Sequence, residues 1–143
     1  MLKMSSTRYY RVLVTGSRTW PNPVLIERYL DILYSKVLTV ITRCDDMLLI
    51  HGDCLTGGDA FADAWAIESG VKVRRYPAQW ETYGKSAGFK RNRYMVRRGA
   101  DICVAFIHNN SRGASDCFRL ARDAGIPCIG IMLNNEGEIR YQI

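Results

Sequence analysis

The sequence lacks long apolar runs and paired-cysteine motifs. No stretch of its 143 residues reaches the roughly 18 apolar residues that span a membrane, and residues 1–7 hold no apolar secretion segment. The five cysteines are odd in number and include no CxxC pair, which disfavours a disulfide framework and a thiolate metal site. We therefore expect a cytoplasmic protein with reduced cysteines, no metal, no cofactor and no membrane partner.

Acidic residues are in the minority. Twenty Lys and Arg residues against fourteen Asp and Glu give a net charge of +6, which fits an anionic partner, either a nucleotide or a nucleic acid. The hydrophobic content of 48% is enough for an ordinary core. Because no linker, composition shift or repeat divides the chain, residues 1–143 predict a single domain, with its core at about 10–132.

Short apolar runs alternate with segments of helical periodicity. Strands are predicted over 10–15, 47–51, 71–76, 102–107 and 127–132, with a short edge strand over 138–143. Helices are predicted between them, at 26–37 with Asn22 as cap, and over 58–69, 85–98 and 114–124. This alternation predicts an α/β, Rossmann-like, doubly wound sheet of about five parallel strands plus the C-terminal edge strand.

Such sheets bind ligands outside the C-terminal ends of their strands, where the strand order reverses. After the first strand come Gly16, Ser17 and Arg18, which offer close backbone approach, a hydroxyl and a bidentate phosphate donor. The alternative is a plain turn with a solvated arginine. Aromatic side chains near these loops, Trp20, Trp80 and Tyr83, are candidates to stack on a base.

The loop after the second strand runs from Gly52 to Asp59. Gly57 and Gly58 stand at a helix start, where free N–H groups and the positive end of the helix dipole favour an anion. Asp53 or Asp59 could accept ribose hydroxyls, or Asp59 could simply cap the helix. The loop contains neither a Walker lysine nor a complete G-x-G-x-x-G motif.

Residues 85–98 carry charge of one sign. Six of the fourteen are basic and none is acidic, whereas solvated helices usually mix their charges. One subset is therefore predicted to meet the ligand, while the rest stays solvated or meets another subunit. The predicted ligand-binding members of this segment are Lys85, Gly88, Arg91 and Asn92.

The segment 108–116 follows the fourth strand and opens the last full helix. Gly113 and Ser115 stand near the helix N-terminus, where small residues form a nest for an anion and a phosphate-binding loop is expected. His108 is a candidate acid or base, or a hydrogen-bonded bystander.

Several motifs occur in a fixed order along about 10–132. They are V-T-G-S-R-x-W at 14–20, H-G with G-G-D within 51–59, A-x-W-x-x-x-G-x-x-A-G at 78–88, R-N-x-x-M at 91–95, and A-F at 105–106 before Gly113. Together they resemble the YspA-like family of the SLOG superfamily. The resemblance implies a Rossmann-like fold that binds nucleotides or nucleotide-derived molecules, among relatives that are often dimers.

The Lonely-guy phosphoribohydrolases of that superfamily carry R-K-x-x-M and P-G-G-x-G-T-x-x-E, with the Arg and the Glu catalytic. Arg91 and Met95 match the first motif, with Asn92 in place of Lys. Of the second motif only Gly113 remains, and Cys117 occupies the Glu position. N-glycosidic cleavage benefits from a carboxylate there, and Asp116, one residue earlier, points about 100° away on a helix.

We first predict a sensor or sequestering protein for a nucleotide or an ADP-ribose-like ligand. Its predicted ligand-binding residues are Gly16, Ser17, Arg18, Trp20, Gly52, Gly57, Gly58, Asp59, Lys85, Gly88, Arg91, Asn92, Gly113 and Ser115. The alternative is a phosphoribohydrolase-like nucleotide hydrolase, with Arg91 orienting phosphate and acid/base candidates Asp53, Asp59 and Asp116. The third hypothesis is single-stranded nucleic acid binding, and a homodimer or higher homo-oligomer is left open.

Overall fold

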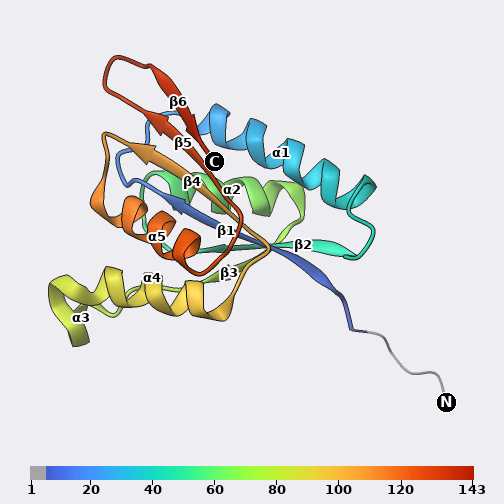
Figure 1. The fold of residues 1–143 in the computed structure, drawn as a ribbon, viewed down its shortest axis with the longest axis horizontal. Helices are drawn as coiled ribbons and strands as arrows, with labels where there is room; N and C mark the ends of the chain where they lie inside the picture. Colours follow the sequence, from blue (N-terminus) through green and yellow to red (C-terminus); the bar gives the residue numbers. More distant parts are fainter. Residues whose placement is uncertain (1–5) are drawn as a thin grey trace.

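The computed structural model describes residues 6–143 as one six-stranded sheet covered by helices on both faces (Figure 1). Residues 1–5, part of the segment for which the sequence predicts no secretion signal, lie outside the described residues. The strands are β1 (Tyr9–Gly16), β2 (Asp46–His51), β3 (Lys72–Arg75), β4 (Ile102–His108), β5 (Cys128–Leu133) and β6 (Ile139–Gln142). The helices are α1 (Pro23–Thr39), α2 (Gly58–Ser69), α3 (Trp80–Tyr83), α4 (Ala87–Arg98) and α5 (Arg112–Asp123), with a 3₁₀ turn η1 (Gly84–Ser86).

The strand order is β3-β2-β1-β4-β5-β6. Strands β1 to β5 are parallel to their neighbours, and β6 pairs antiparallel with β5. The order reverses between β1 and β4, so the loops after these two strands meet at the switch point. The predicted Rossmann-like, mostly parallel sheet with a C-terminal edge strand is confirmed.

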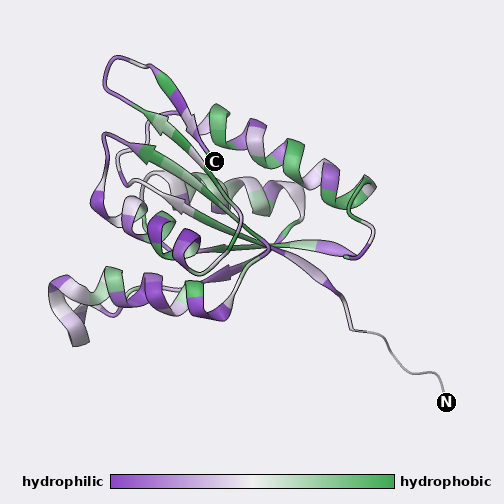
Figure 2. Ribbon diagram, in the orientation of Figure 1, coloured by the Kyte–Doolittle hydropathy of each residue, from purple (hydrophilic) through white to green (hydrophobic). Residues whose placement is uncertain are grey.

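Both faces of the central strands are buried. On β1, Val12 and Val14 pack toward α1 and α2, whereas Leu13 between them packs toward α4 and α5. Figure 2 shows the resulting apolar strands inside, with hydrophilic residues prominent along α4. Two-sided burial explains why β1, β2 and β4 appear in the sequence as continuous apolar runs rather than alternating ones.

The helix boundaries follow local chemistry. Asn22 caps α1 as predicted, its side chain accepting from the Leu25 N–H at 3.1 Å, and Pro23 occupies the first helical turn. The predicted helix over 85–98 is divided into η1 and α4, and the sequence did not predict α3. Gly84 has a φ of 58°, which ends α3 and turns the chain before α4 begins. No helix of residues 6–143 is long and apolar enough to cross a membrane.

Candidate functional site

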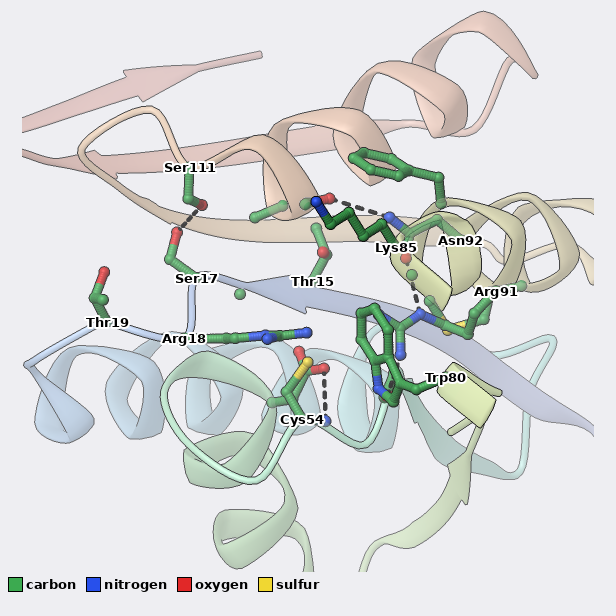
Figure 3. A pocket seen from close by; sticks show the side chains of 18 residues that line it. Thr15, Ser17, Arg18, Thr19, Cys54, Trp80, Lys85, Arg91, Asn92 and Ser111 are labelled. Carbon is green, nitrogen blue, oxygen red and sulfur yellow. Dashed lines mark hydrogen bonds between the residues drawn. The ribbon is translucent and has the colours of Figure 1, made fainter. Parts of the chain in front are cut away.

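A pocket of about 270 Å³ opens at the C-terminal ends of β1, β2 and β4 (Figure 3). It lies at the switch point, where the topology places ligands in sheets of this kind. Ten of the fourteen predicted ligand-binding residues line it, so the loops converge as expected. These are Gly16, Ser17, Arg18, Gly52, Asp59, Lys85, Gly88, Arg91, Asn92 and Gly113.

Two serine hydroxyls join the loops after β1 and β4. The Ser17 hydroxyl accepts from the backbone N–H of His108 at 2.8 Å and hydrogen-bonds with the hydroxyl of Ser111, the N-cap residue of α5. The Ser17 N–H donates to the Phe106 carbonyl at 2.9 Å. The switch-point loops are therefore fixed to one another, and hydroxyl groups stand at the start of α5 beside the pocket.

The N-terminus of α5 is open to the pocket. Gly113 and Ala114 line it, and the first backbone N–H of this helix with a backbone acceptor is that of Ser115, which donates to the Ser111 carbonyl at 3.1 Å. Ser115, a predicted ligand-binding residue, does not line the pocket. The preceding amides have no backbone acceptor, and they stand with the positive helix end at the pocket.

The N-terminus of α2 is closed by packing. The Gly58 N–H donates to the Ser17 carbonyl at 3.0 Å, and a Cβ on Gly16 would lie 2.4 Å from the Gly58 Cα. Gly57 has a φ of 76° and presses against the backbone carbonyl of Ser17. The prediction that both glycine amides face an anion is wrong for Gly58, and neither glycine lines the pocket. Their smallness lets α2 approach β1.

Arg91 braces the pocket wall. Its Nη1 donates to the carbonyls of Gly52 and, at 3.3 Å, of Tyr76, and its Nε donates to Asn92 Oδ1 at 2.9 Å. A Cβ on Gly52 would lie 2.6 Å from the guanidinium carbon, so a larger residue at this position would displace the Arg91 guanidinium. Within residues 6–143 the Nη2 group has no hydrogen-bond partner, and it is the donor left for a ligand.

Asn92 connects α4 to α5 from a buried position, 3% exposed. Besides accepting from Arg91, it donates through Nδ2 to the Gly113 carbonyl at 3.1 Å and to Asp116 Oδ2 at 3.2 Å. Its amide thus orients both the guanidinium and the first turn of α5. A lysine, as in the related R-K-x-x-M motif, has no acceptor for the Arg91 Nε and could not do this.

Three cations face the pocket without a carboxylate partner. Within the described chain, Arg18, Lys85 and Arg91 make no ion pair at or below 4.0 Å. The Arg18 guanidinium lies over the Trp80 ring, 5.2 Å from its centroid, and Figure 3 shows it extended across the pocket. The walls are therefore positive, as a phosphate site requires.

Asp59 is the carboxylate that lines the pocket. Its side chain is 3% exposed, and Oδ2 accepts from the Cys54 N–H at 3.3 Å, whereas Oδ1 finds no partner among the described residues. Burial raises the pKa of Asp59 above its ordinary value. A buried oxygen without a donor, in a pocket, marks a position where a ligand can complete the hydrogen bonding.

The other two acid/base candidates are held elsewhere. Asp53 has a φ of 57° and donates its N–H to His51 Nδ1, and it does not line the pocket. Asp116 Oδ1 accepts from Arg119 at 3.0 Å and its Oδ2 from Asn92. Of the three predicted carboxylates, only Asp59 is therefore within reach of a ligand in the pocket.

Comparison with known proteins shows the family of this chain. A model of the YspA, cpYpsA-related SLOG family matches residues 10–83. The chain belongs to this family. The Gene 61 protein of Mycobacterium phage D29 is 38% identical over 125 residues, which cover 83% of this chain and 94% of that protein. The family match ends before α4, so Arg91, Asn92 and the α5 N-terminus join the site of this SLOG domain on structural grounds.

Trp20 of this SLOG domain lies in the core rather than at the site. It is 2% exposed, packs edge-on to Phe106 with ring centroids 5.4 Å apart, and donates through Nε1 to the Asn22 carbonyl at 2.7 Å. The apolar environment behind β1 explains this placement, and the prediction of base stacking by Trp20 is wrong. Trp80 lines the pocket instead, whereas Tyr83 lines a neighbouring groove.

The SLOG site contains no activated thiol. Burial raises the pKa of Cys117 to about 12, and the pKa of Cys54 is raised by burial and by the nearby Asp59. All five cysteines are free. Over residues 6–143, no three His, Cys, Asp or Glu side chains gather as a metal site would require.

The sequence did not predict a network of hydrogen bonds that lies behind the pocket. His51, 1% exposed, accepts from the Asp53 N–H through Nδ1 at 2.9 Å, so its Nε2 is the donor to Asp63 Oδ2 at 2.6 Å. Arg75 donates to both Asp63 oxygens, and this interaction lowers the pKa of that carboxyl. These hydrogen bonds hold the turn at Gly52 in place. The sequence feature that could have indicated this network is the H-G pair at the end of a strand.

Several further pocket residues are not among the predicted ligand-binding residues. Most are small or apolar residues adjacent to predicted ones: Thr15, Thr19, Cys54, Phe89, Met95, Ser111 and Ala114. Ser111 could have been found as the N-cap before the Gly-led helix. His108, a candidate acid or base, does not line the pocket. Its Nδ1 forms a hydrogen bond with the hydroxyl of Thr19 at 2.8 Å.

Proposed function

We propose that this SLOG domain binds a nucleotide or an ADP-ribose-like derivative in the pocket, as a sensor or a sequestering protein. The observation that carries the proposal is the unpartnered Oδ1 of Asp59, in a pocket that three cations without an ion-pair partner also line. Phosphate matches the cations, and a sugar hydroxyl supplies the donor that the carboxylate lacks. A ligand with both groups, side by side, complements the pocket better than a simple anion does.

The phosphate is assigned to the open start of α5. There the amides of Gly113 and Ala114, the Ser111 hydroxyl and the Lys85 ammonium offer donors of several kinds. Backbone amides at a helix N-terminus attract phosphate without the reorganisation that flexible side chains need. The Arg91 Nη2 would approach from the opposite wall.

The base is assigned to Trp80. Its side chain is 47% exposed, and a Cβ on Gly88 would lie 3.3 Å from the ring atom Cη2, so the glycine leaves room for the indole against α4. Aromatic rings of this kind stack on nucleobases regardless of base identity. This placement leaves the sugar between base and phosphate, within the reach of Asp59.

Calorimetric titration with AMP, ADP and ADP-ribose tests the proposal. The wild type should bind at least one of them with a micromolar Kd. Arg18→Ala should weaken it by about tenfold to a hundredfold, since a charge-assisted hydrogen bond contributes about 1.5–3 kcal/mol. Lys36→Ala, which removes an exposed charge from α1, is the matched control and should bind as the wild type does. If no member of the panel binds below millimolar concentration, the proposal fails.

A second function, nucleotide hydrolysis, is favoured by the raised pKa of Asp59. Because burial raises its pKa, the Asp59 carboxyl holds a proton more readily than an ordinary aspartate, as a general acid toward a leaving base must. Water would then add at the sugar C1′ as the N-glycosidic bond breaks, which yields the free base and a sugar phosphate. Chromatography of AMP incubated with the wild type and with Asp59→Asn decides between binding and turnover. Equal base release by both proteins would contradict hydrolysis by Asp59.

A further inference from the structure

The basic charge of the chain is concentrated in one segment. Residues 71–98 contain nine Lys and Arg residues against one Glu, a net charge of +8, whereas the whole chain carries +6, so the remainder is net negative. This segment supplies β3, at the edge of the sheet, and α4 beside it. The positive surface is therefore local, and it extends well beyond the pocket.

A groove of about 520 Å³ runs through this surface, between the segment 75–79 and one face of α4. We call it the tyrosine groove, because Tyr76, Tyr83 and Tyr94 line it together with the cations Arg75, Lys90 and Arg91. Tyr83 and Tyr94 are 46% and 51% exposed. No acidic side chain is among its lining residues.

The rings and the charges of the groove are interleaved. The Tyr76 and Tyr94 rings meet edge to face with centroids 5.6 Å apart, and the Lys90 ammonium lies 4.6 Å from the Tyr83 ring centroid. Lys90 and Tyr94 are one turn apart on α4, so the cation lies near two partly exposed aromatic side chains, Tyr83 and Tyr94. Arg91 borders both the groove and the pocket, but the other groove residues do not line the pocket.

Single-stranded nucleic acid matches this combination. Its phosphates complement the cations of a segment whose net charge is +8, and its unpaired bases present flat faces that tyrosine rings stack on. A duplex hides those faces, and an acidic peptide offers the charge without them. We propose that the tyrosine groove is a second binding site, separate from the pocket, that takes a single-stranded oligonucleotide through Tyr83, Lys90 and Tyr94.

Fluorescence anisotropy of a labelled 20-nucleotide strand, in DNA and RNA forms, tests the proposal. The wild type should bind at low salt with an affinity that falls steeply as salt rises. Tyr94→Ala should weaken binding about tenfold, whereas Tyr94→Phe, which keeps the ring, should bind as the wild type does. Lys90→Ala should remove about one phosphate contact and so reduce the slope of log affinity against log salt by about one. Lys36→Ala is the matched control and should leave this slope unchanged.

Two further arms separate the groove from the pocket. Asp59→Asn should leave oligonucleotide binding unchanged, and excess AMP should not displace the strand. Displacement by AMP, unchanged affinity of Tyr94→Ala, or equal binding of a 20-base-pair duplex would each overturn the proposal, as would the absence of binding in 50 mM salt. Because calorimetry reports on the pocket independently, failure of one site leaves the other testable.

Discussion

Two helices begin at the same edge of the sheet, and their first turns differ in how their backbone amides are used. At α2, the Gly58 N–H is bonded to the Ser17 carbonyl, and the glycines bring backbone against backbone. At α5, Gly113 has nothing within 4 Å of where a Cβ would stand, and its turn lines the pocket. Glycine serves close packing in one case and open access in the other, although both sequences resemble phosphate-binding loops.

Among the predictions that test this comparison, the largest effect is expected at Gly58, the closely packed glycine of α2. Gly58→Ala should lower the free energy of unfolding by about 3 kcal/mol, because the added methyl would stand 2.5 Å from the Gly16 Cα and both backbones must move. Gly113→Ala is the matched control and should leave stability unchanged or slightly raised. Urea denaturation of both variants measures the difference. Equal loss in the two would mean that α5 is as tightly packed as α2.

The link between α4 and α5 is the next most sensitive point. Asn92→Leu should destabilise the fold by about 2–3 kcal/mol, since it removes the partners of Arg91 Nε, the Gly113 carbonyl and Asp116 in a buried place. Arg93→Leu, on the adjacent exposed position, is the control. Thermal unfolding measures the difference. Equal Tm values for the two variants would contradict the role of Asn92 in joining α4 to α5.

Substitution of Asp59 should stabilise the fold, in contrast to the two destabilising substitutions above. Burial raises its pKa above the ordinary 3.8, so the folded state holds the proton more tightly, and the stability falls as pH rises from about that value through the raised pKa. Asp59→Asn should therefore raise the free energy of unfolding at pH 7 by about 1 kcal/mol and reduce its pH dependence, while weakening nucleotide binding.

Asp63, on the same helix, is the matched carboxylate for that experiment. Its pKa is lowered by the hydrogen bonds from Arg75, so its contribution to stability is present above the unfolded pKa and is lost as pH falls. Asp63→Asn should destabilise the protein at pH 7. Urea titrations of both variants at pH 5 and pH 7 suffice, and a stabilising Asp63→Asn would refute the assignment.

Arg18 should have the smallest effect on stability. Its side chain is exposed and unpaired, so Arg18→Ala should change the free energy of unfolding by less than about 0.5 kcal/mol while it impairs nucleotide binding. Arg91→Ala should impair both, because it also removes donors to the Gly52 and Tyr76 carbonyls. A large loss of stability in Arg18→Ala would show that it, too, supports the fold.

The fold and most of the pocket follow from the sequence because they rest on local patterns. Short apolar runs located most of the strands, and the strand order brings the loops after β1 and β4 together. The role of each glycine did not follow, since Gly58 and Gly113 differ only in what approaches them from elsewhere in the chain. Trp20 was misassigned for the same reason, because the core behind β1 is formed by residues distant in sequence.

The central claim is that phosphate lies on the first turn of α5 and not on that of α2. Titration of the ¹⁵N-labelled protein with AMP, followed by amide chemical shifts, tests it most directly. We expect the largest shifts at Gly113 and Ala114, with the amides of Gly57 and Gly58 nearly unmoved. Largest shifts at Gly57 and Gly58, or none anywhere at millimolar AMP, would contradict it.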